Sequence, residues 1–213
     1  MKVTKEKAIE NRAALVHAAG RLFRERGIDG VGVAEISQKA GLTHGALYAQ
    51  FPSKEALAAE AFASGLRPGL EILTANEADL PAGLTDFVDH YMSFDHRDNL
   101  AAGCPMSASA SEVARQDKMV GERFAEGFEQ IVALFERGLG ASPVKADTRQ
   151  RALAMMAAMI GGVAAARAVA KADPKLSNQI LRAVRQIVGE VGGAEAQVDG
   201  ARGRARPTRR RAN

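Results

Sequence analysis

We predict an all-α fold of about nine helices for this chain of 213 residues, with a small N-terminal domain followed by a larger helical bundle. Three observations support this fold class. Apolar residues recur every three or four positions along nearly every segment, which is the period of an amphipathic helix. Alternating β-branched runs and Asn-Gly hairpin turns are absent. Hydrophobic residues make up 46% of the chain and charged residues 25%, which is sufficient for a buried core.

The N-terminal domain, residues 1–52, is predicted to contain three helices. The first is expected to start after Thr4, a suitable cap, and to end near Gly27. A short second helix is expected over residues 33–40, and a short third helix follows a break at residues 41–43. The predicted inward stripe of the first helix consists of Ile9, Ala13, Val16, Ala19 and Phe23.

The second domain, residues 53–192, begins with a helix that Ser53 caps and that Pro68 is expected to kink or interrupt. Residues 95–99 are predicted to be a polar connection between helices. Residues 193–213 are rich in Gly, Ala and Arg and are expected to form a disordered tail. The remaining helices are expected over residues 81–91, 105–115, 118–139, 146–171 and 174–192.

The charge of the chain is concentrated at its two ends. Residues 1–54 carry nine Lys/Arg and five Asp/Glu, whereas residues 55–199 carry fourteen Lys/Arg and twenty Asp/Glu. Residues 200–213 carry six arginines and no acid. Two basic ends on an acidic body indicate that the ends, rather than the body, meet a polyanion.

Several classes of protein are disfavoured by composition. A single cysteine excludes an internal disulfide framework and a cysteine-based structural zinc site. The charged N-terminus does not resemble a signal peptide, and the weakly polar run 153–170 contains Arg167 and is too short and polar for a membrane span. We therefore expect a cytoplasmic protein without a membrane partner.

The stretch from Val33 to Phe51 has the spacing of a helix-turn-helix. Ile36 and Leu47 are expected to face the core between two crossing helices, and Gly41 lets the turn adopt a positive φ. Such a unit places its second helix in the major groove of DNA. The same spacing also occurs as plain structure in helical bundles, so spacing alone leaves both interpretations open.

The wider run, residues 40–57, reads AGLTHGALYAQFPSKEAL. Together with the preceding residues from about position 8, it resembles the DNA-binding domain of TetR-family transcriptional regulators. The resemblance implies a TetR-like fold, with a helical ligand-binding and dimerisation domain after the helix-turn-helix. The run GCPMSASASEVAR, residues 103–115, also looks like one seen in a branch of this family, although the signal is weaker.

The resemblance implies a role in contacting double-stranded DNA for seven residues. Thr43 and His44 open the recognition helix, where they would meet phosphate and base edges, and Tyr48 would donate its hydroxyl to a phosphate. Gly45 leaves room for the helix to sit deep in the groove. The seven predicted DNA-binding residues are Thr43, His44, Gly45, Ala46, Tyr48, Gln50 and Lys54.

Each polar residue in this set has a simpler alternative. Tyr48 can be a packing residue, Lys54 a solvated surface lysine, and His44 a residue that contacts only water. One departure from the family pattern also matters: Gly32 stands where a Ser or Thr usually caps the second helix. Glycine is an acceptable cap but lacks a hydroxyl, so only its backbone amide remains for a phosphate.

The last two helices carry apolar stripes that suggest a homodimer, because one short recognition helix reads too few base pairs for a genomic site. Small residues such as Ala157 and Gly161 would permit close approach of two copies. The alternative is that the stripes pack only inside one chain. The predicted interface consists of Leu153, Met156, Ile160, Val163, Ile180, Val184 and Ile187.

The body between these helices is rich in Met and aromatic residues, which form adaptable apolar pockets. We expect a small apolar or amphipathic ligand there, although the same residues also describe an ordinary core. The predicted lining residues are Phe62, Leu66, Phe87, Tyr91, Met106, Phe124, Phe128, Met155 and Met159.

No catalytic arrangement is recognisable, so we expect neither an enzyme nor a cofactor. Cys104 is interpreted as a buried, inert thiol, with an oxidation sensor or an intersubunit bridge as alternatives. We expect no metal at His90 and His96, because their spacing would put them on different helix faces. The arginine-rich tail either adds nonspecific phosphate attraction or stays solvated.

The sequence therefore predicts a ligand-responsive transcriptional regulator, a repressor that binds a palindromic operator as a homodimer. The first alternative is an all-α protein-interaction module whose helix-turn-helix is structural. A second alternative is a helical enzyme with a small-molecule cavity.

Overall fold

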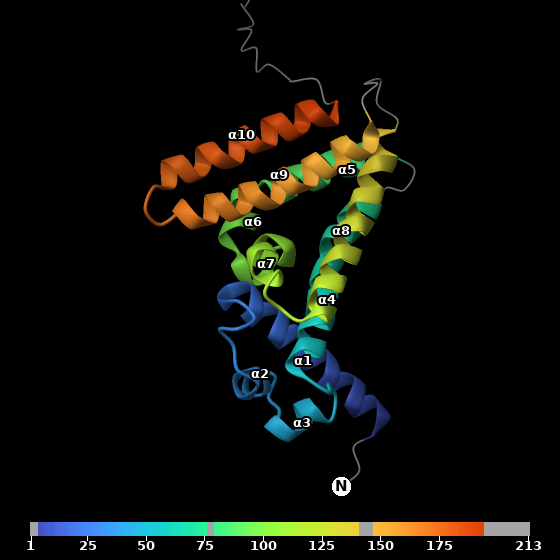
Figure 1. The fold of residues 1–213 in the computed structure, drawn as a ribbon, viewed down its shortest axis with the longest axis vertical. Helices are drawn as coiled ribbons and strands as arrows, with labels where there is room; N and C mark the ends of the chain where they lie inside the picture. The colour runs from blue at the N-terminus through green and yellow to red at the C-terminus, as the bar shows by residue number, and fades with distance from the viewer. Residues whose placement is uncertain (1–3, 76–78, 141–146, 194–213) are drawn as a thin grey trace, which may run out of the picture.

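The computed structural model describes residues 4–75, 79–140 and 147–193. All regular structure in these ranges is helical, as predicted, with ten α-helices and one 3₁₀ helix (Figure 1). The predicted disordered tail lies outside the described residues except for Gly193. The elements are α1 (Lys5–Arg26), α2 (Val33–Lys39), α3 (His44–Tyr48), α4 (Lys54–Thr74), α5 (Leu80–Tyr91), α6 (Phe94–Asp98), η1 (Leu100–Ala102), α7 (Pro105–Val113), α8 (Lys118–Leu139), α9 (Thr148–Val169) and α10 (Pro174–Gly192).

The molecule is elongated, with α1, α2 and α3 at one end and α9 and α10 across the other (Figure 1). The long helices α4 and α8 pack side by side and connect the two ends. Helix α7 lies between them and α9, and it also contacts α1. Helices α9 and α10 form the most extensive helix pair in the fold.

The N-terminal core holds α1, α2, α3 and the start of α4 together. Leu15, Ile36, Leu47 and Leu57 are fully buried in it, and Val120 of α8 joins the same cluster. This core therefore connects to the body through α8 as well as through α4.

The predicted stripe of α1 needs a correction at its N-terminal end. Val16, Ala19 and Phe23 are buried, but Ile9 is 62% exposed and Ala13 is also exposed. The first turns of α1 extend past the short helices α2 and α3, which leaves these apolar side chains without a surface to pack on (Figure 1). Periodicity along one helix carries no information on how far its neighbours reach.

Local signals located the helix ends well. Thr4 Oγ1 accepts a hydrogen bond from the Lys7 amide at 3.2 Å, and Gly27 ends α1 with a φ of 78°. Ser53 caps α4 through a 3.2 Å bond from the Ala56 amide. In contrast to the expected interruption, α4 continues through Pro68 as one helix of 21 residues.

The segment around residues 95–99, predicted as a polar connection, forms the short helix α6. Ser93 caps it by accepting from the His96 amide at 3.1 Å, and His96 is buried. The ring of His96 lies 5.8 Å from that of His90, between centroids. The expected separation of these two histidines on one helix was wrong, because α5 ends between them.

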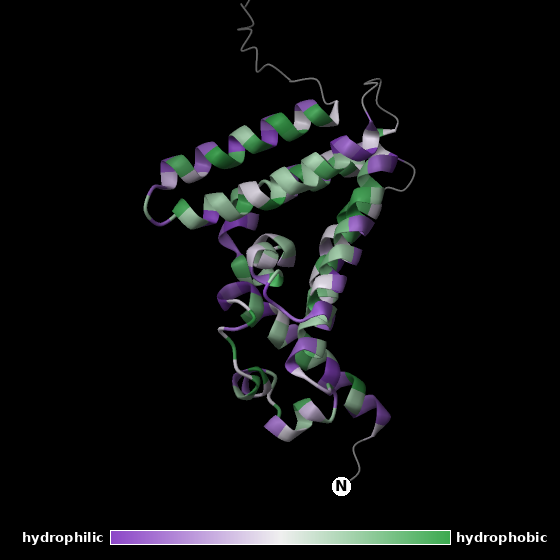
Figure 2. Ribbon diagram, viewed as in Figure 1, coloured by the Kyte–Doolittle hydropathy of each residue, from purple (hydrophilic) through white to green (hydrophobic). Residues whose placement is uncertain are grey.

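The body core is one apolar cluster built from α4, α5, α7, α8, α9 and α10. Helix α9 runs through it. Contrary to the expectation for residues 153–170, this helix is long and apolar enough to cross a membrane by length and composition alone, with a mean hydropathy of 1.8 over its most apolar window. Its inner side packs on α7, α8 and α10, as expected of the central helix of a bundle. The apolar colouring along α9 in Figure 2 therefore reflects both its buried side and an outer side of small residues.

Candidate nucleic-acid interface

Helices α2 and α3 form a tight helix-turn-helix at the end of the molecule opposite α9 and α10. Gly41 adopts a φ of 70°, as predicted, which lets the Leu42 amide donate to the Ser37 carbonyl at 2.9 Å. Ser37, 1% exposed, also donates its hydroxyl to the Val33 carbonyl. Ile36 and Leu47 are fully buried between the helices, so α3 is held rigidly against α2.

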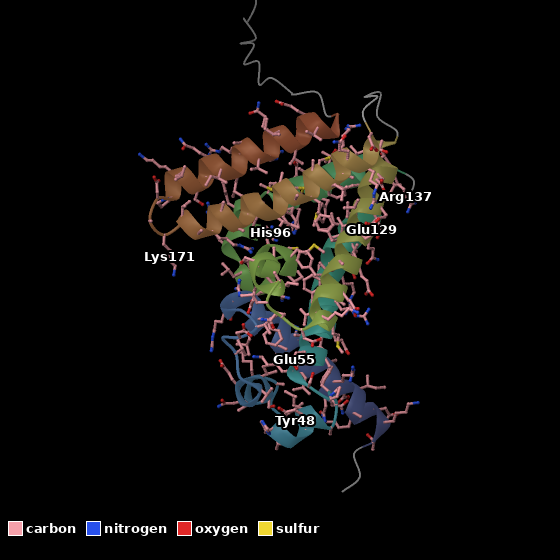
Figure 3. The ribbon with its side chains drawn as sticks, in the orientation of Figure 1. Tyr48, Glu55, His96, Glu129, Arg137 and Lys171 are labelled. Carbon is pink, nitrogen blue, oxygen red and sulfur yellow. The ribbon has the colours of Figure 1, made fainter. Side chains whose placement is uncertain are left out.

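The recognition helix α3 presents its N-terminal side chains to solvent. Thr43 Oγ1 accepts from the Ala46 amide at 3.3 Å, which caps the helix and leaves the hydroxyl proton free to donate outward. His44 and Gly45 are exposed, and a Cβ added at Gly45 would meet no atom within 4 Å. Tyr48 is 49% exposed and lies at the tip of the molecule (Figure 3).

The rings of His44 and Tyr48 form a T-shaped pair, with centroids 5.1 Å apart. One turn of helix separates the two residues, so both lie on the same outward side of α3. The ring contact restricts the rotamers of two exposed side chains. It presents a preorganised edge rather than two independent side chains.

The other predicted DNA-binding residues surround this edge. Ala46, Gln50 and Lys54 are partly exposed, and Lys54 is the first residue of α4. No carboxylate in the described ranges pairs with Lys54 or with Lys39 at the end of α2, so both ammonium groups are available to an anion. Gly32 begins α2 without a side-chain capping bond, as its lack of a hydroxyl requires.

Arg12 of α1 connects three elements of this domain and was missed by the sequence analysis. Its Nη1 donates to the Gln50 carbonyl at 2.6 Å, its Nε donates to Glu60 Oε1 at 3.0 Å, and its Nη2 also donates to Glu60. The guanidinium therefore joins α1 to α4 and to the segment just after α3. No local sequence signal marks such a residue, because its partners are 38 and 48 positions away.

Two acidic side chains near the interface are neutralised by such contacts. Glu60 pairs with Arg12, and Glu35 of α2 pairs with Arg26 of α1 at 2.5 Å. Because these carboxylates already have partners, they repel an approaching polyanion less than free acids would.

Two family models match the chain. Residues 15–61 match the model described as bacterial regulatory proteins, tetR family, and residues 82–184 match the model for the C-terminal domain of LmrA/YxaF-like transcriptional regulators. The chain belongs to the TetR family. It is a DNA-binding transcriptional regulator, and not an enzyme, as the sequence predicted.

Relatives of this TetR-family protein support both halves of the assignment. LmrA of Bacillus subtilis is 26% identical over 161 residues, which cover 72% of this chain and 84% of LmrA. TtgR of Pseudomonas putida is 44% identical over 54 residues, a match that spans only about a quarter of the length of each protein.

Solved structures share the fold. A TetR transcriptional regulator from Chloroflexus aurantiacus superposes with a TM-score of 0.72 at 25% identity, covering 87% of this chain and 95% of that one. The reduced form of Escherichia coli NemR gives a TM-score of 0.70 at 20% identity, covering 84% and 95%. The TetR-like fold predicted from the sequence is confirmed.

Three residues predicted for the dimer interface are corrected by their burial within the single TetR-family chain. Met156 and Val163 are fully buried and Ile160 is 7% exposed, because they face the body core from α9. Of the other predicted residues, Leu153 and Ile187 are exposed, whereas Ile180 and Val184 are partly buried. Val184 packs against Gly162, where an added Cβ would lie 3.0 Å from its methyl groups.

All nine residues predicted to line a ligand pocket belong to the body core or pack against it. Seven are buried, and Phe124 and Phe128 of α8 are partly buried. Phe62 and Phe124 pack with ring centroids 5.5 Å apart, and Phe87 contacts both Tyr91 and Phe135. The structure thus brings the predicted residues together, and leaves their role in ligand binding as a prediction.

Proposed function

We propose that this TetR-family protein is a repressor that binds a palindromic operator as a homodimer and responds to a small apolar or amphipathic ligand. The observation that supports it best is the exposed edge of α3: His44, Gly45 and Tyr48 are exposed, and Tyr48 lies at the tip of the molecule (Figure 3). A helix anchored by buried Leu47 and exposed along its N-terminal side is the form in which side chains reach base edges in the major groove.

The position of each residue on the exposed side of α3 indicates its role in DNA binding. His44 reads a base, because it opens α3 and is fully on the outward side, and Ala46 contacts a thymine methyl group. Tyr48 and Thr43 donate hydroxyl protons to phosphates, and Gly45 allows close approach of the helix. Gln50 contacts the backbone or a base beside α3.

Lys54 binds a phosphate at the N-terminus of α4, where its charge adds to that of the helix dipole. The Ala56 amide already donates to Ser53 Oγ and is not available to a phosphate. The phosphate would therefore be bound by the Lys54 ammonium group and by the other amides of the first turn. This phosphate contact is independent of sequence, in contrast to that of His44.

The proposed dimer uses the outer sides of α9 and α10. Leu153 is 37% exposed, and along the same side of α9 the side chains are small and apolar. Leu176 and Ile187 of α10 are 41% and 55% exposed, with Ile180 partly exposed between them. Two copies joined here would form a four-helix interface.

Dimerisation at this end matches the requirement of the DNA. A two-fold dimer reads half-sites about 34–36 Å apart on one side of the duplex. The helix-turn-helix lies at the opposite end from α9 and α10, so two joined copies would present two recognition helices in one direction (Figure 1). A ligand that changes their spacing would change operator affinity.

The proposed organisation keeps the predicted division into a DNA-binding domain, residues 1–52, and a ligand-binding and dimerisation domain, residues 53–192. We propose a cytoplasmic location, since a regulator of this family acts on the bacterial chromosome. The proposed activity requires no metal or other cofactor.

Footprinting on DNA upstream of the gene itself tests this function. We expect a protected palindrome with the wild-type protein. Lys54→Ala should weaken binding to all sequences, and His44→Ala should change the preferred sequence. Lys171→Ala is the matched control for Lys54→Ala, because Lys171 is exposed at the far end of the molecule (Figure 3).

The same footprint distinguishes the repressor from the alternative, a protein-interaction module. Uniform, salt-sensitive protection without a palindrome would contradict the repressor assignment and favour a structural helix-turn-helix in an interaction module. If His44→Ala, Tyr48→Phe and Lys54→Ala all bind as wild type does, the residue roles are wrong.

A further inference from the structure

The hydroxyl of Tyr91 is a buried polar group without a partner. Tyr91 is 3% exposed, and within the described residues its hydroxyl is the single buried side-chain oxygen or nitrogen that forms no hydrogen bond. A buried donor left unpaired costs free energy, so folded proteins contain few such groups. The hydroxyl lies at the end of α5, inside the body core, where bulk solvent does not reach it.

The surroundings of this hydroxyl are rich in donors. The Cys104 thiol lies beside it. The pKa of Tyr91 is raised well above its usual value, mainly by burial and to a smaller extent by the neighbouring Cys104. Burial also raises the pKa of the Cys104 thiol. Both groups therefore keep their protons at neutral pH.

Arg167 of α9 adds a positive charge to the same place. Its Nη1 donates to Ser107 Oγ at 3.1 Å, while its other nitrogens donate to the backbone carbonyls of His96 and Arg97. No carboxylate pairs with this guanidinium in the described part of the chain. The carboxylate of Asp98, which pairs with Arg97, acts on this guanidinium only from beyond ion-pair distance.

His96 does not supply an acceptor. Its Nε2 accepts from the Cys104 amide at 3.0 Å, which leaves the proton on Nδ1, 2.6 Å from the Tyr91 carbonyl oxygen. Both ring nitrogens are therefore occupied, although the ring packs 4.5 Å from that of Tyr91, between centroids. The cluster offers O–H, S–H and a cation. The Cys104 sulfur and the Ser107 oxygen lie beside the Tyr91 hydroxyl, but neither forms a hydrogen bond of acceptable geometry with it.

The remaining neighbours are apolar and adaptable. Phe87 lies 5.5 Å from the Tyr91 ring, between centroids, and Met106 and Met159 belong to the same cluster. Methionine side chains reorient at low cost, so this layer can open around an apolar molecule.

We propose that Tyr91, Cys104 and Arg167 form the polar end of the effector site, and that the effector is an apolar molecule with a hydrogen-bond-accepting oxygen, either a carbonyl or a carboxylate. The inference rests on the proposed ligand-responsive function and specifies the chemistry of its ligand. The acceptor oxygen pairs with the Tyr91 hydroxyl, and the apolar body displaces the methionine side chains.

The location also connects the effector to the DNA-binding end. Cys104 follows η1, whose Ala101 carbonyl accepts from Arg24 of α1 at 2.8 Å from Nε. At the other end of α7, Glu112 accepts from the Asp29 amide, just after α1, at 3.0 Å. Both contacts join the N-terminal domain to the segment that runs from η1 through α7, and Cys104 lies within that segment. A ligand that moves Cys104 would therefore shift both contacts.

Calorimetric titration with three probes of equal chain length tests the proposal: octanoate, 2-octanone and octylamine. We expect octanoate and 2-octanone to bind and octylamine not to bind, because only the first two carry an acceptor oxygen without a positive charge. Stronger binding of octanoate identifies a carboxylate as the preferred group, and stronger binding of 2-octanone identifies a neutral carbonyl.

Tyr91→Phe is the decisive variant, since it removes only the hydroxyl. We expect about a fivefold to tenfold loss of affinity for the acceptor-bearing probes. The melting temperature of the ligand-free variant should not fall, because no internal hydrogen bond is lost. Tyr48→Phe is the matched control, as the other tyrosine in the chain; it should keep probe binding and lose DNA affinity.

Three outcomes would overturn the proposal: equal probe affinity in Tyr91→Phe and wild type, octylamine binding as tightly as octanoate, or no binding of any probe at millimolar concentration. Footprinting of Tyr91→Phe without ligand separates the two hypotheses. A normal footprint with unchanged probe affinity rejects the effector site alone, whereas the absence of any footprint in wild type rejects the repressor function.

Discussion

The guanidinium of Arg12 lies over the ring of Phe51, with Cζ 4.1 Å from the ring centroid. Phe51 is 1% exposed and follows the recognition helix, so this contact fixes the exit of α3 against α1. The hydrogen bonds from Arg12 to Gln50 and Glu60 hold the same junction from two further directions. The orientation of α3 therefore depends on a residue more than thirty positions before it.

Arg12→Ala should lower the free energy of unfolding by about 1–2 kcal/mol, because it removes a cation–π contact and a multiply bonded guanidinium. Urea denaturation measures this change. Lys7→Ala is the control, since Lys7 forms only an exposed pair with Glu10. Arg12→Lys should keep part of the stability but lose operator selectivity, measured as the ratio of operator to random-sequence affinity. An unchanged ratio in both variants would show that Arg12 does not position α3.

Stability should fall as the pH drops from 6.5 toward 4, because burial, followed by the charge of Arg167, lowers the pKa of His96 to about 4. The unfolded chain, with a histidine pKa near 6.5, then binds a proton that the folded chain does not bind. The contribution of His96 is complete above pH 6.5 and decreases by on the order of 3 kcal/mol by pH 4.

Urea denaturation of the wild type and His96→Gln across this pH range measures the effect. The slope should flatten in His96→Gln, whereas His17→Gln should keep the wild-type slope because His17 is exposed on α1, away from His96. Equal slopes in all three proteins would mean that another group dominates the acid sensitivity.

Gly41→Ala should destabilise the helix-turn-helix by about 1–2 kcal/mol, since its φ of 70° disfavours any residue with a Cβ. A Cβ there would meet no atom within 4 Å, so the cost comes from the backbone and not from a clash. Thermal unfolding measures it. The matched control is Gly45→Ala, which lies within α3 in open space and should be neutral or stabilising. Gly45→Ala should nevertheless weaken DNA binding if that side of α3 enters the groove.

Ile187→Glu should convert the proposed dimer into monomers, because it places a charge on a 55% exposed apolar residue of α10. Analytical ultracentrifugation measures the change. Met119→Glu is the control, since Met119 is 44% exposed at the start of α8, away from α9 and α10. Dimers that persist in Ile187→Glu and in Leu153→Glu would place the interface elsewhere.

Much of the secondary structure could be predicted because its signals are local. Caps such as Thr4 and Ser53, the break at Gly41 and the period of α8 and α10 each depend on residues within a few positions of one another. The helix-turn-helix was found for the same reason. The helix α6 was missed, because five residues are too short for periodicity to be visible.

Relations between distant segments could not be predicted in this way. A stripe on α9 or α10 marks an apolar side but does not say whether a neighbouring helix of the same chain covers it. Met156 and Val163 of α9 are buried and Leu153 is exposed, although all three are large apolar residues at helical spacing in the sequence. The same limit explains the exposure of Ile9.

Contiguous residues are enough to identify this chain as helical, to locate its helix-turn-helix and to reveal its resemblance to TetR-family regulators. In contrast, the contacts by which Arg12 holds the recognition helix, and the burial of the Tyr91 hydroxyl beside Cys104 without a hydrogen bond, are visible only in the folded chain. Hydrogen bonding and burial are satisfied between segments far apart in the chain, and their outcome depends on packing that no local pattern records.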